Sequence, residues 1–388
     1  TYIATLWVEA PLACRPHIPL LVVLHVSGAL RVPADYPTIE AAILAATPGD
    51  VVVLDDGVYT GDGNRELDFG GKAITVRSAS GNPATCIIDC GGVAQGFYFR
   101  NAEGPDSVLE GVTIRNAHDD YDGGAVHCEY SRPTLLNCWI VSSTTGRSGA
   151  GVYARFAEPR LVNCVLVDNS AAASGGGLYA ASDARPVLTN CTIVGNSAGE
   201  YGGGLAFSYS RGTLVNSIIW ANSGDQIYRT SSTVSVTYCD VQGGFSGVGN
   251  KNADPCFVDA AAGDYRLAAG SPCIDAGKNS AVPADVLDLD GDGNTTEPIP
   301  FDVLGQLRFS DDPATADTGS GTPPLVDMGA HEYQRPVSFA DFEAFAECMS
   351  GPGVTFEAGC GAFDFQNDID VDLADFVWLQ RAFHGDEP

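Results

Sequence analysis

The chain has 388 residues, with 20 Lys and Arg against 49 Asp and Glu, and so carries a formal net charge of -29 at pH 7. A surface this acidic repels phosphate groups, which makes nucleic acid and anionic lipid poor partners and divalent cations favourable ones. Hydrophobic residues form 45% of the chain, which excludes a disordered acidic tail. The 46 glycines predict many tight turns and few helices.

An apolar stretch over residues 18–26 follows Arg15 and His17 and ends in small residues. This order is typical of an export signal, but a packing strand retained in the mature protein has the same composition. Residues 1–30 are therefore expected to be either a leader or a retained apolar segment. No stretch reaches about 20 apolar residues, so the sequence predicts no membrane span.

Glycine-led tetrapeptides recur at steps of 26 or 27 residues, starting at Gly124, Gly151, Gly177 and Gly204. Each repeat holds short apolar runs separated by turn residues, and none of the runs is long enough for a helix. A unit of this length built from strands is one coil of a parallel β-helix, with coils about 4.8 Å apart. Aligned on the glycines, the repeats predict an inward file of Ala125, Val152, Leu178 and Leu205, and a second inward file of His127, Ala154, Ala180 and Phe207.

A second series places an asparagine and then a small residue at the same point of every coil. We expect the asparagine amides to bond from coil to coil at a turn, and the cysteines to be buried apolar groups and not disulfides or metal ligands. The asparagines are Asn137, Asn163, Asn190 and Asn216, and the cysteines are Cys138, Cys164 and Cys191, with Ser217 in the fourth place.

The fold class predicted from these patterns is an all-β solenoid with a helical cap at its N-terminal end. The cap is expected over residues 38–46 and the β-helix over residues 31–275. An irregular acidic section follows at residues 276–335, and a small separate module at residues 336–388.

Residues 30–59 resemble the entry of secreted bacterial right-handed β-helix proteins of the pectin-lyase-like superfamily. The Gly-Gly-Gly-Leu-Tyr and Asn-Ser-Ala repeats are similar to those of polymorphic outer-membrane and adhesin-type β-helices. Residues 271–277 and 326–333 together resemble the end of surface proteins with exchangeable C-terminal anchors. The resemblance implies a right-handed helix and a secreted, extracellular or cell-surface location. It leaves activity open, because the superfamily holds lyases, hydrolases, esterases and inert adhesins.

The tail resembles the paired helices and calcium loop of EF-hand, dockerin-like modules, which are frequent on secreted proteins of planctomycete-type bacteria. A calcium loop places oxygen ligands at positions 1, 3, 5, 7, 9 and 12. Ile369 stands where the loop usually has glycine, and Cys348 and Cys360 are expected to form a disulfide in the other half. The predicted Ca²⁺ ligands are Asp364, Asp368, Asp370, Asp372 and Asp375, with Gln366 in the second place.

A second acidic stretch has the same ligand spacing. Asp288, Asp290, Asp292 and Asn294 occupy positions 1, 3, 5 and 7 of a calcium loop, with glycine at position 6. Position 12 is apolar, so Glu297 or Asp302 would have to complete the shell. The alternative is a solvated acidic loop without an ion.

Catalytic residues are harder to find. Asp119 and Asp120, with His127, form the only crowded polar stretch on the predicted solenoid, and the paired aspartates resemble those of polygalacturonases. The other signatures of those enzymes are absent, and the repeat alignment buries His127. Twenty Lys and Arg over the whole chain also leave little for a basic groove.

The sequence therefore favours a non-catalytic, extracellular structural or adhesive protein of a surface layer, matrix or filament. Its expected partner is a second copy or another cell-surface protein, and a glycan is a further candidate. A second copy would add head to tail by strand addition through residues 19–26. The alternative is a polysaccharide lyase or glycoside hydrolase that acts on acidic glycans.

Overall fold

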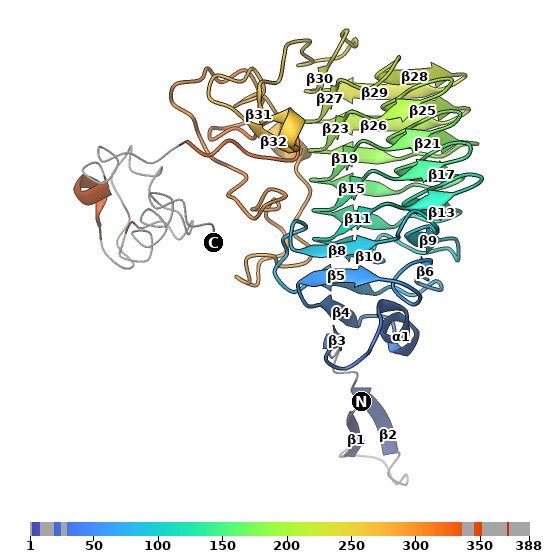
Figure 1. Ribbon diagram of the computed structural model, residues 1–388. Coiled ribbons are helices and arrows are strands. Elements are labelled where there is room, and N and C mark those ends of the chain that lie inside the picture. The colour runs from blue at the N-terminus through green and yellow to red at the C-terminus, as the bar shows by residue number, and fades with distance from the viewer. Residues whose placement is uncertain (1, 8–18, 25–28, 336–344, 351–370, 372–388) are drawn as a thin grey trace, which may run out of the picture.

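The computed structural model describes residues 2–7, 19–24, 29–335, 345–350 and 371, and its main body is a parallel β-solenoid (Figure 1). The predicted solenoid is confirmed. Each coil contributes one strand to each of three long parallel sheets, and four coils add a short strand to a fourth.

The first sheet has nine strands: β3 (Ala29–Val32), β4 (Val51–Leu54), β7 (Thr75–Ser78), β10 (Val108–Glu110), β14 (Thr134–Leu136), β18 (Arg160–Val162), β22 (Val187–Thr189), β26 (Arg211–Val215) and β29 (Thr233–Thr237). The second has eight: β5 (Gly57–Thr60), β8 (Cys86–Asp89), β11 (Thr113–Arg115), β15 (Trp139–Val141), β19 (Val165–Val167), β23 (Thr192–Val194), β27 (Ile218–Trp220) and β30 (Asp240–Val241). The third has seven: β6 (Leu67–Asp68), β9 (Phe97–Phe99), β13 (Val126–Glu129), β17 (Val152–Arg155), β21 (Leu178–Ala181), β25 (Leu205–Ser208) and β28 (Ile227–Thr230). The fourth has four: β12 (His118–Asp119), β16 (Thr144–Thr145), β20 (Ser170–Ala171) and β24 (Ser197–Ala198).

Both ends of the stack are covered. At the N-terminal end lies the predicted helix, α1 (Ile39–Ala45), whose first turn is capped by the hydroxyl of Thr38 accepting from the Ala41 amide at 3.2 Å. Its buried face packs into the main core. At the other end residues 242–252 fold over the last coil, and the amide of Val241 donates to the carbonyl of Lys251 at 3.0 Å.

The inward files differ from the sequence alignment by one residue in the first repeat. Val126, and not Ala125, pairs with Val152, Leu178 and Leu205. His127 pairs with Tyr153, so the prediction that it joins the file of Ala154, Ala180 and Phe207 is wrong, and Cys128 takes that place. Successive residues of a strand point to opposite faces, so the one-residue shift moves His127 from the inside to the outside.

The asparagine ladder forms as predicted over three coils. Asn163 donates from Nδ2 to Oδ1 of Asn137 at 3.0 Å, and Asn190 donates to Oδ1 of Asn163 at 3.2 Å. All four asparagines have a φ near +50°, a conformation that asparagine tolerates better than most residues. Asn216 leaves the ladder and bonds instead to the backbone of Lys278. The ladder therefore fixes a turn in each coil and also anchors the C-terminal part of the chain.

The cysteines of the repeat are buried, unpaired thiols. Cys138, Cys164 and Cys191 each have no exposed surface, and each lies within hydrogen-bond distance of a backbone carbonyl two residues earlier. Burial raises the pKa of the Cys138 and Cys164 thiols well above its usual value. Thiolate is the reactive form, so these groups are protected both by their position and by their protonation state.

We expect a thiol reagent to label Cys256 in the native protein while the three repeat cysteines stay unmodified. Cys256 is exposed, whereas labelling of the repeat cysteines requires the coils to open. Peptide mapping after a short treatment with iodoacetamide measures this, with a urea-unfolded sample as the control. Labelling of Cys164 at the rate of Cys256 would contradict the described core.

The coils end earlier than the predicted boundary at residue 275, because β30 is the last strand of the parallel sheets. Next comes an antiparallel pair, β31 (Phe257–Asp259) and β32 (Asp264–Leu267), with the short 3-10 helix η1 (Ala260–Ala262) between them, and a second 3-10 helix, η2 (Asn279–Ala281), follows. From there to residue 335 the chain is irregular and packs along the side of the solenoid (Figure 1). We call residues 257–333 the C-terminal section.

A buried arginine, paired with a glutamate of the same section, binds this section to the coils. Arg308 has no exposed surface, and its guanidinium lies 3.3 Å from the carboxylate of Glu332. The other end of the guanidinium donates to Oδ1 of Asn163 at 2.8 Å, and so reaches the asparagine ladder 145 residues earlier in the sequence. Its remaining hydrogen bonds go to the carbonyls of Gly329 and Ala330. Arg308 thus joins residues 329–332 of the section to one coil.

Stability should increase when the pH falls from 8 to about 6.5 in the absence of divalent cations. Burial raises the pKa of Asp327 to about 8, so the folded protein keeps a proton there that the unfolded chain, with a pKa of about 3.9, has lost. Burial lowers the pKa of His331 to about 3, so acidification below about 6.5 charges this group in the unfolded chain alone and removes stability. Between pH 8 and about 6.5, protonation of Asp327 therefore stabilises the folded protein, and His331 does not yet oppose this gain.

Urea unfolding at the two pH values measures the difference, which is on the order of 1–2 kcal/mol for one such group. Asp327→Asn should reduce it. A wild-type protein that is more stable at pH 8 would contradict the expectation.

The N-terminal strands β1 (Tyr2–Trp7) and β2 (Pro19–Leu24) form a separate antiparallel pair. The apolar segment predicted for strand exchange thus has a partner within its own chain. Among the residues that the structure describes, no helix has the length and apolar character needed to cross a membrane.

Candidate functional site: an arginine groove beside an aromatic corner

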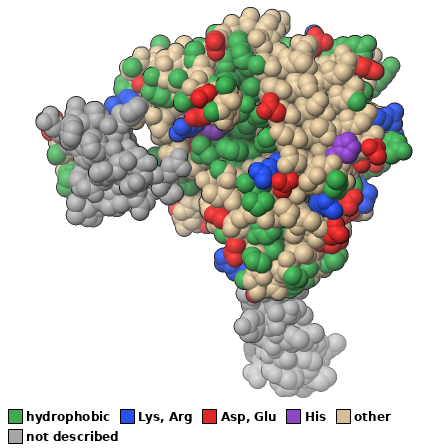
Figure 2. All heavy atoms as spheres, in the orientation of Figure 1, with side chains coloured by type: hydrophobic (Ala, Val, Ile, Leu, Met, Phe, Trp, Pro, Cys, Tyr) green, Lys and Arg blue, Asp and Glu red, His purple; other side chains and the backbone are tan. Residues whose placement is uncertain are grey.

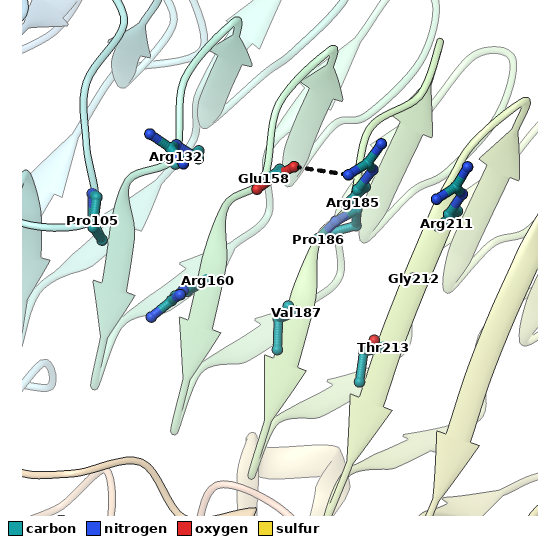
Figure 3. A pocket seen from close by; sticks show the side chains of 10 residues that line it. All are labelled: Pro105, Arg132, Glu158, Arg160, Arg185, Pro186, Val187, Arg211, Gly212 and Thr213. Atoms are coloured by element: carbon teal, nitrogen blue, oxygen red, sulfur yellow. Dashed lines mark ion pairs between the residues drawn. The ribbon is translucent and has the colours of Figure 1, made fainter.

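An open groove of about 370 Å³ runs along the outer face of the first sheet and is rich in arginine. Two outward files form it. The first contains Arg132, Glu158, Arg185 and Arg211, one on each of four successive coils, and the second contains Arg160 on β18 (Figure 3). The groove is lined by Pro105, Arg132, Glu158, Arg160, Arg185, Pro186, Val187, Arg211, Gly212 and Thr213, and we call it the arginine groove.

Prolines set the backbone of the first file. Pro133, Pro159 and Pro186 follow the file residues on three coils and are buried, and their carbonyls accept the amides of Arg160, Val187 and Thr213 at 2.9–3.1 Å. A proline keeps the residue before it extended, so each of these file residues points outward two residues before its strand begins. In the fourth coil Gly212 replaces proline, because an added Cβ would lie 2.4 Å from the ring of Phe207.

Most of the groove arginines have no acidic partner. Arg185 lies 3.5 Å from Glu158 and 3.0 Å from Asp183, whereas no carboxylate of the described chain lies within 4.0 Å of Arg132, Arg160 or Arg211. All four arginines are exposed. On the face shown in Figure 2, by contrast, the few basic side chains mostly lie beside acidic ones.

The lining therefore carries four arginines against one glutamate, a positive strip on a chain with a net charge of -29. The prediction that too few basic residues exist for a basic groove is wrong, because a fifth of them gather here.

Exposed aromatic rings border the groove. Tyr130 and Phe156 stand two residues before the first file, at the turn after the third sheet, and their rings stack at 5.0 Å with an angle of 8° between planes. Tyr209 occupies the same turn two coils further on, and the exposed fractions of the three side chains are 60%, 40% and 70%. These three residues, which we call the aromatic corner, have φ values near +50° that turn the chain sharply. A second hollow links Tyr209 to Arg211.

The residues predicted for catalysis do not converge. His127 lies between Tyr98 and Tyr153, with its ring centroid 4.9 Å from that of Tyr153, and burial lowers its pKa. Its Nδ1 lies 3.2 Å from the carbonyl of Asp122. Asp119 accepts the amide of Tyr121, and exposed Asp120 lies 3.3 Å from His118. Among the described residues no hydrogen bond or ion pair joins either aspartate to His127.

The predicted stack of Tyr153 and Tyr179 is confirmed, at 5.9 Å between ring centroids. His127 lies next to this stack, with its ring tilted by 51° against that of Tyr153. The site predicted for catalysis is therefore a packed aromatic file beside separate surface carboxylates.

The acidic loop at residues 288–294 forms on the C-terminal section. Carboxylate oxygens of Asp288, Asp290 and Asp292 lie within 4.8 Å of one another. Asp288 also accepts the amide of Gly293 at 2.9 Å, and Asp292 accepts that of Asn294 at 2.6 Å. Asp302, named as a possible further ligand, lies elsewhere, buried and bound to the amides of Leu304, Gln306 and Glu332.

The predicted dockerin-like ligands Asp364, Asp368, Asp370, Asp372 and Asp375 lie outside the described residues, as does Cys360. Cys348 is disulfide-bonded. The Ca²⁺ loop of the tail and the pairing of Cys348 with Cys360 thus stay predictions.

The arginine groove had a signal in the sequence that the repeat analysis did not use. Arg132, Arg185 and Arg211 each stand three positions before the inward leucine of the asparagine series, and Arg160 stands one position before it. Both offsets are odd, so on a strand they place all four arginines on the face opposite the leucines.

The central coils match a known family model. Residues 124–252 match the model of the right-handed β-helix region. No curated protein matches the chain. Among solved structures, the pectate lyase Pel9A is similar at 14% identity and a TM-score of 0.40, with 76% of this chain and 91% of that one covered. A pectin methyl esterase of the rice weevil is similar at 10% identity and a TM-score of 0.27, with coverages of 57% and 78%. The family match supports the right-handed β-helix.

Proposed function

We propose that the protein is a non-catalytic, extracellular adhesive β-helix protein that binds an acidic polysaccharide along the arginine groove. The observation that carries the proposal is the set of exposed arginines without acidic partners on an otherwise acidic chain. Unpaired cations in one open strip attract a polyanion despite the net charge, because screening limits the influence of distant carboxylates to about 8–10 Å.

The arrangement of the arginines suits a linear, carboxylated polymer. From Arg132 to Arg211 the chain climbs three coils, which at ~4.8 Å per coil is roughly 14 Å. A guanidinium presents paired donors that match a carboxylate. A polyuronate chain that lies along the stack therefore meets arginines on successive coils, and each can pair with a uronate carboxylate. The aromatic corner runs parallel to this strip and offers flat apolar faces for sugar rings.

The lining of the groove favours binding over cleavage. Glycoside hydrolysis requires two carboxyl groups that face one bond, and lyase chemistry with Ca²⁺ requires carboxylates beside a base. The groove lining has one carboxylate, that of Glu158, and Arg185 lies 3.5 Å from it. The lyase and hydrolase alternative therefore has little chemical support in this groove.

Electrophoresis in a gel that contains polygalacturonate tests the proposal. We expect the mobility of the protein to fall as the polymer concentration increases, and the recovered polymer to keep its length and to show no new unsaturated ends. Shortened or unsaturated polymer would establish the enzyme alternative if this cleavage disappears in Asp119→Ala or His127→Ala. Unchanged mobility would reject glycan binding.

Head-to-tail assembly into a filament stays a prediction. Strand addition requires free sheet edges at the ends of the stack, and here helix α1 and residues 242–252 cover them. Glycan binding is accordingly the better supported adhesive role.

A further inference from the structure

The C-terminal section folds a hairpin-like segment against the first sheet. Val282 and Ile299 pack with Leu136 and Val162 of the solenoid. Between them the two arms run side by side, because the amide of Asp285 donates to the carbonyl of Glu297 at 2.8 Å. The side chains of these two acids thus meet at the base of the acidic loop.

Three carboxylate oxygens at this base lack any hydrogen-bond donor. Asp285 is 1% exposed; its Oδ2 accepts the amide of Leu289 at 2.7 Å, but its Oδ1 has no partner. Both side-chain oxygens of Glu297 are shielded from solvent and also have none. Oxygen atoms of Asp285, Asp290 and Glu297 all lie within 4.8 Å of one another.

Such an arrangement is costly unless a cation occupies it. A buried carboxylate that lacks a donor loses its hydration without compensation, and neighbouring like charges add repulsion. Among the described residues no Lys or Arg nitrogen lies within 4.0 Å of the three carboxylates. Within this distance the described residues therefore supply no positive charge to the three carboxylates.

We propose that Asp285, Asp290 and Glu297 bind one calcium ion, which fastens the acidic loop to the base of its own hairpin against the solenoid. Carboxylate oxygens are the ligands that Ca²⁺ prefers, and its flexible shell of six to eight oxygens is completed by water at the exposed side of Asp290. The inference is independent of glycan binding.

This site differs from the one that the loop spacing predicts. Asp290 belongs to both sets, and Glu297 is a candidate to complete the predicted loop. Asp288 and Asp292, however, accept amides of their own loop at 2.9 and 2.6 Å. Unpartnered, shielded oxygens lie at Asp285 and Glu297 instead. The ion is therefore placed at the base of the loop and not at its tip.

Two variants of the full chain distinguish the sites. After removal of metal with EDTA, equilibrium dialysis against calcium should show one ion fewer per chain in Glu297→Gln than in the wild type. Asp292→Asn, which removes the same charge from the tip of the loop, should keep the wild-type number. Calcium should also protect residues 282–299 from protease in the wild type and in Asp292→Asn, but not in Glu297→Gln.

The wild-type number of bound ions in Glu297→Gln would overturn the site, and so would loss of an ion in Asp292→Asn alone. If Glu297→Gln fails to fold, as judged by circular dichroism, the exposed Asp290→Asn takes its place. That variant must lose one ion, and retention of the full number overturns the proposal.

Discussion

Replacing Arg160 and Arg211 together with alanine should weaken binding of polygalacturonate by about 30-fold. Each exposed guanidinium that pairs with a uronate carboxylate contributes roughly 1 kcal/mol, and 1.4 kcal/mol corresponds to a tenfold change in affinity. Neither arginine has an acidic partner among the described residues, so their removal leaves no carboxylate in that part of the chain unpaired. The fold should therefore persist while the affinity falls.

The matched control is the double variant Arg31→Ala with Arg100→Ala. It makes the same change in net charge, but these arginines lie outside the groove and pair with Asp55 and Asp68. Calorimetric titration of both doubles separates a local effect from a general one. Equal losses in the two proteins would show that the polymer responds to overall charge and not to the arginine groove.

Arg308→Met should destabilise the C-terminal section by about 3–5 kcal/mol, the usual result of removing one partner from a buried ion pair. Glu332 would stay buried without its cation, and Asn163 would lose the bond that ties the section to the ladder. Asp302, also buried nearby, would lose the same compensating charge. The section should detach before the coils unfold.

Urea unfolding combined with limited proteolysis measures this effect, with cleavage expected first within residues 257–333. Arg266→Met is the control, because Arg266 lies in the same section but pairs with Asp264 at the surface, where such pairs contribute about 1 kcal/mol or less. A loss of stability in Arg308→Met no larger than in Arg266→Met would contradict the role given to the buried pair.

The solenoid could be predicted from the sequence because each coil repeats the same inward residues at nearly constant steps. Leu135, Leu161 and Leu188 pair as aligned, and the asparagine two residues after each occupies the same turn. The error at His127 arose from the glycine series. Adjacent glycines in neighbouring coils permit two alignments one residue apart, and on a strand that shift exchanges inside and outside.

The docking of the C-terminal section could not be predicted in the same way. Its contacts join residues as distant as Asn163 and Arg308, and no repeat or motif relates them. The arginine groove was predictable from the sequence only in part. Its residues follow the repeat, but their significance depends on the absence of acidic neighbours, which only the packed coils define.

Calorimetric titration of the wild-type protein with polygalacturonate and with its methyl-esterified form tests the proposed function most directly. Esterification removes the carboxylate charges and keeps the sugar chain. We expect binding of the acidic polymer that weakens strongly at about 0.3 M salt, and little binding of the ester, because paired charges dominate the contact. Equal binding of both polymers, or binding of the acidic one that salt does not change, would contradict recognition by the arginine groove.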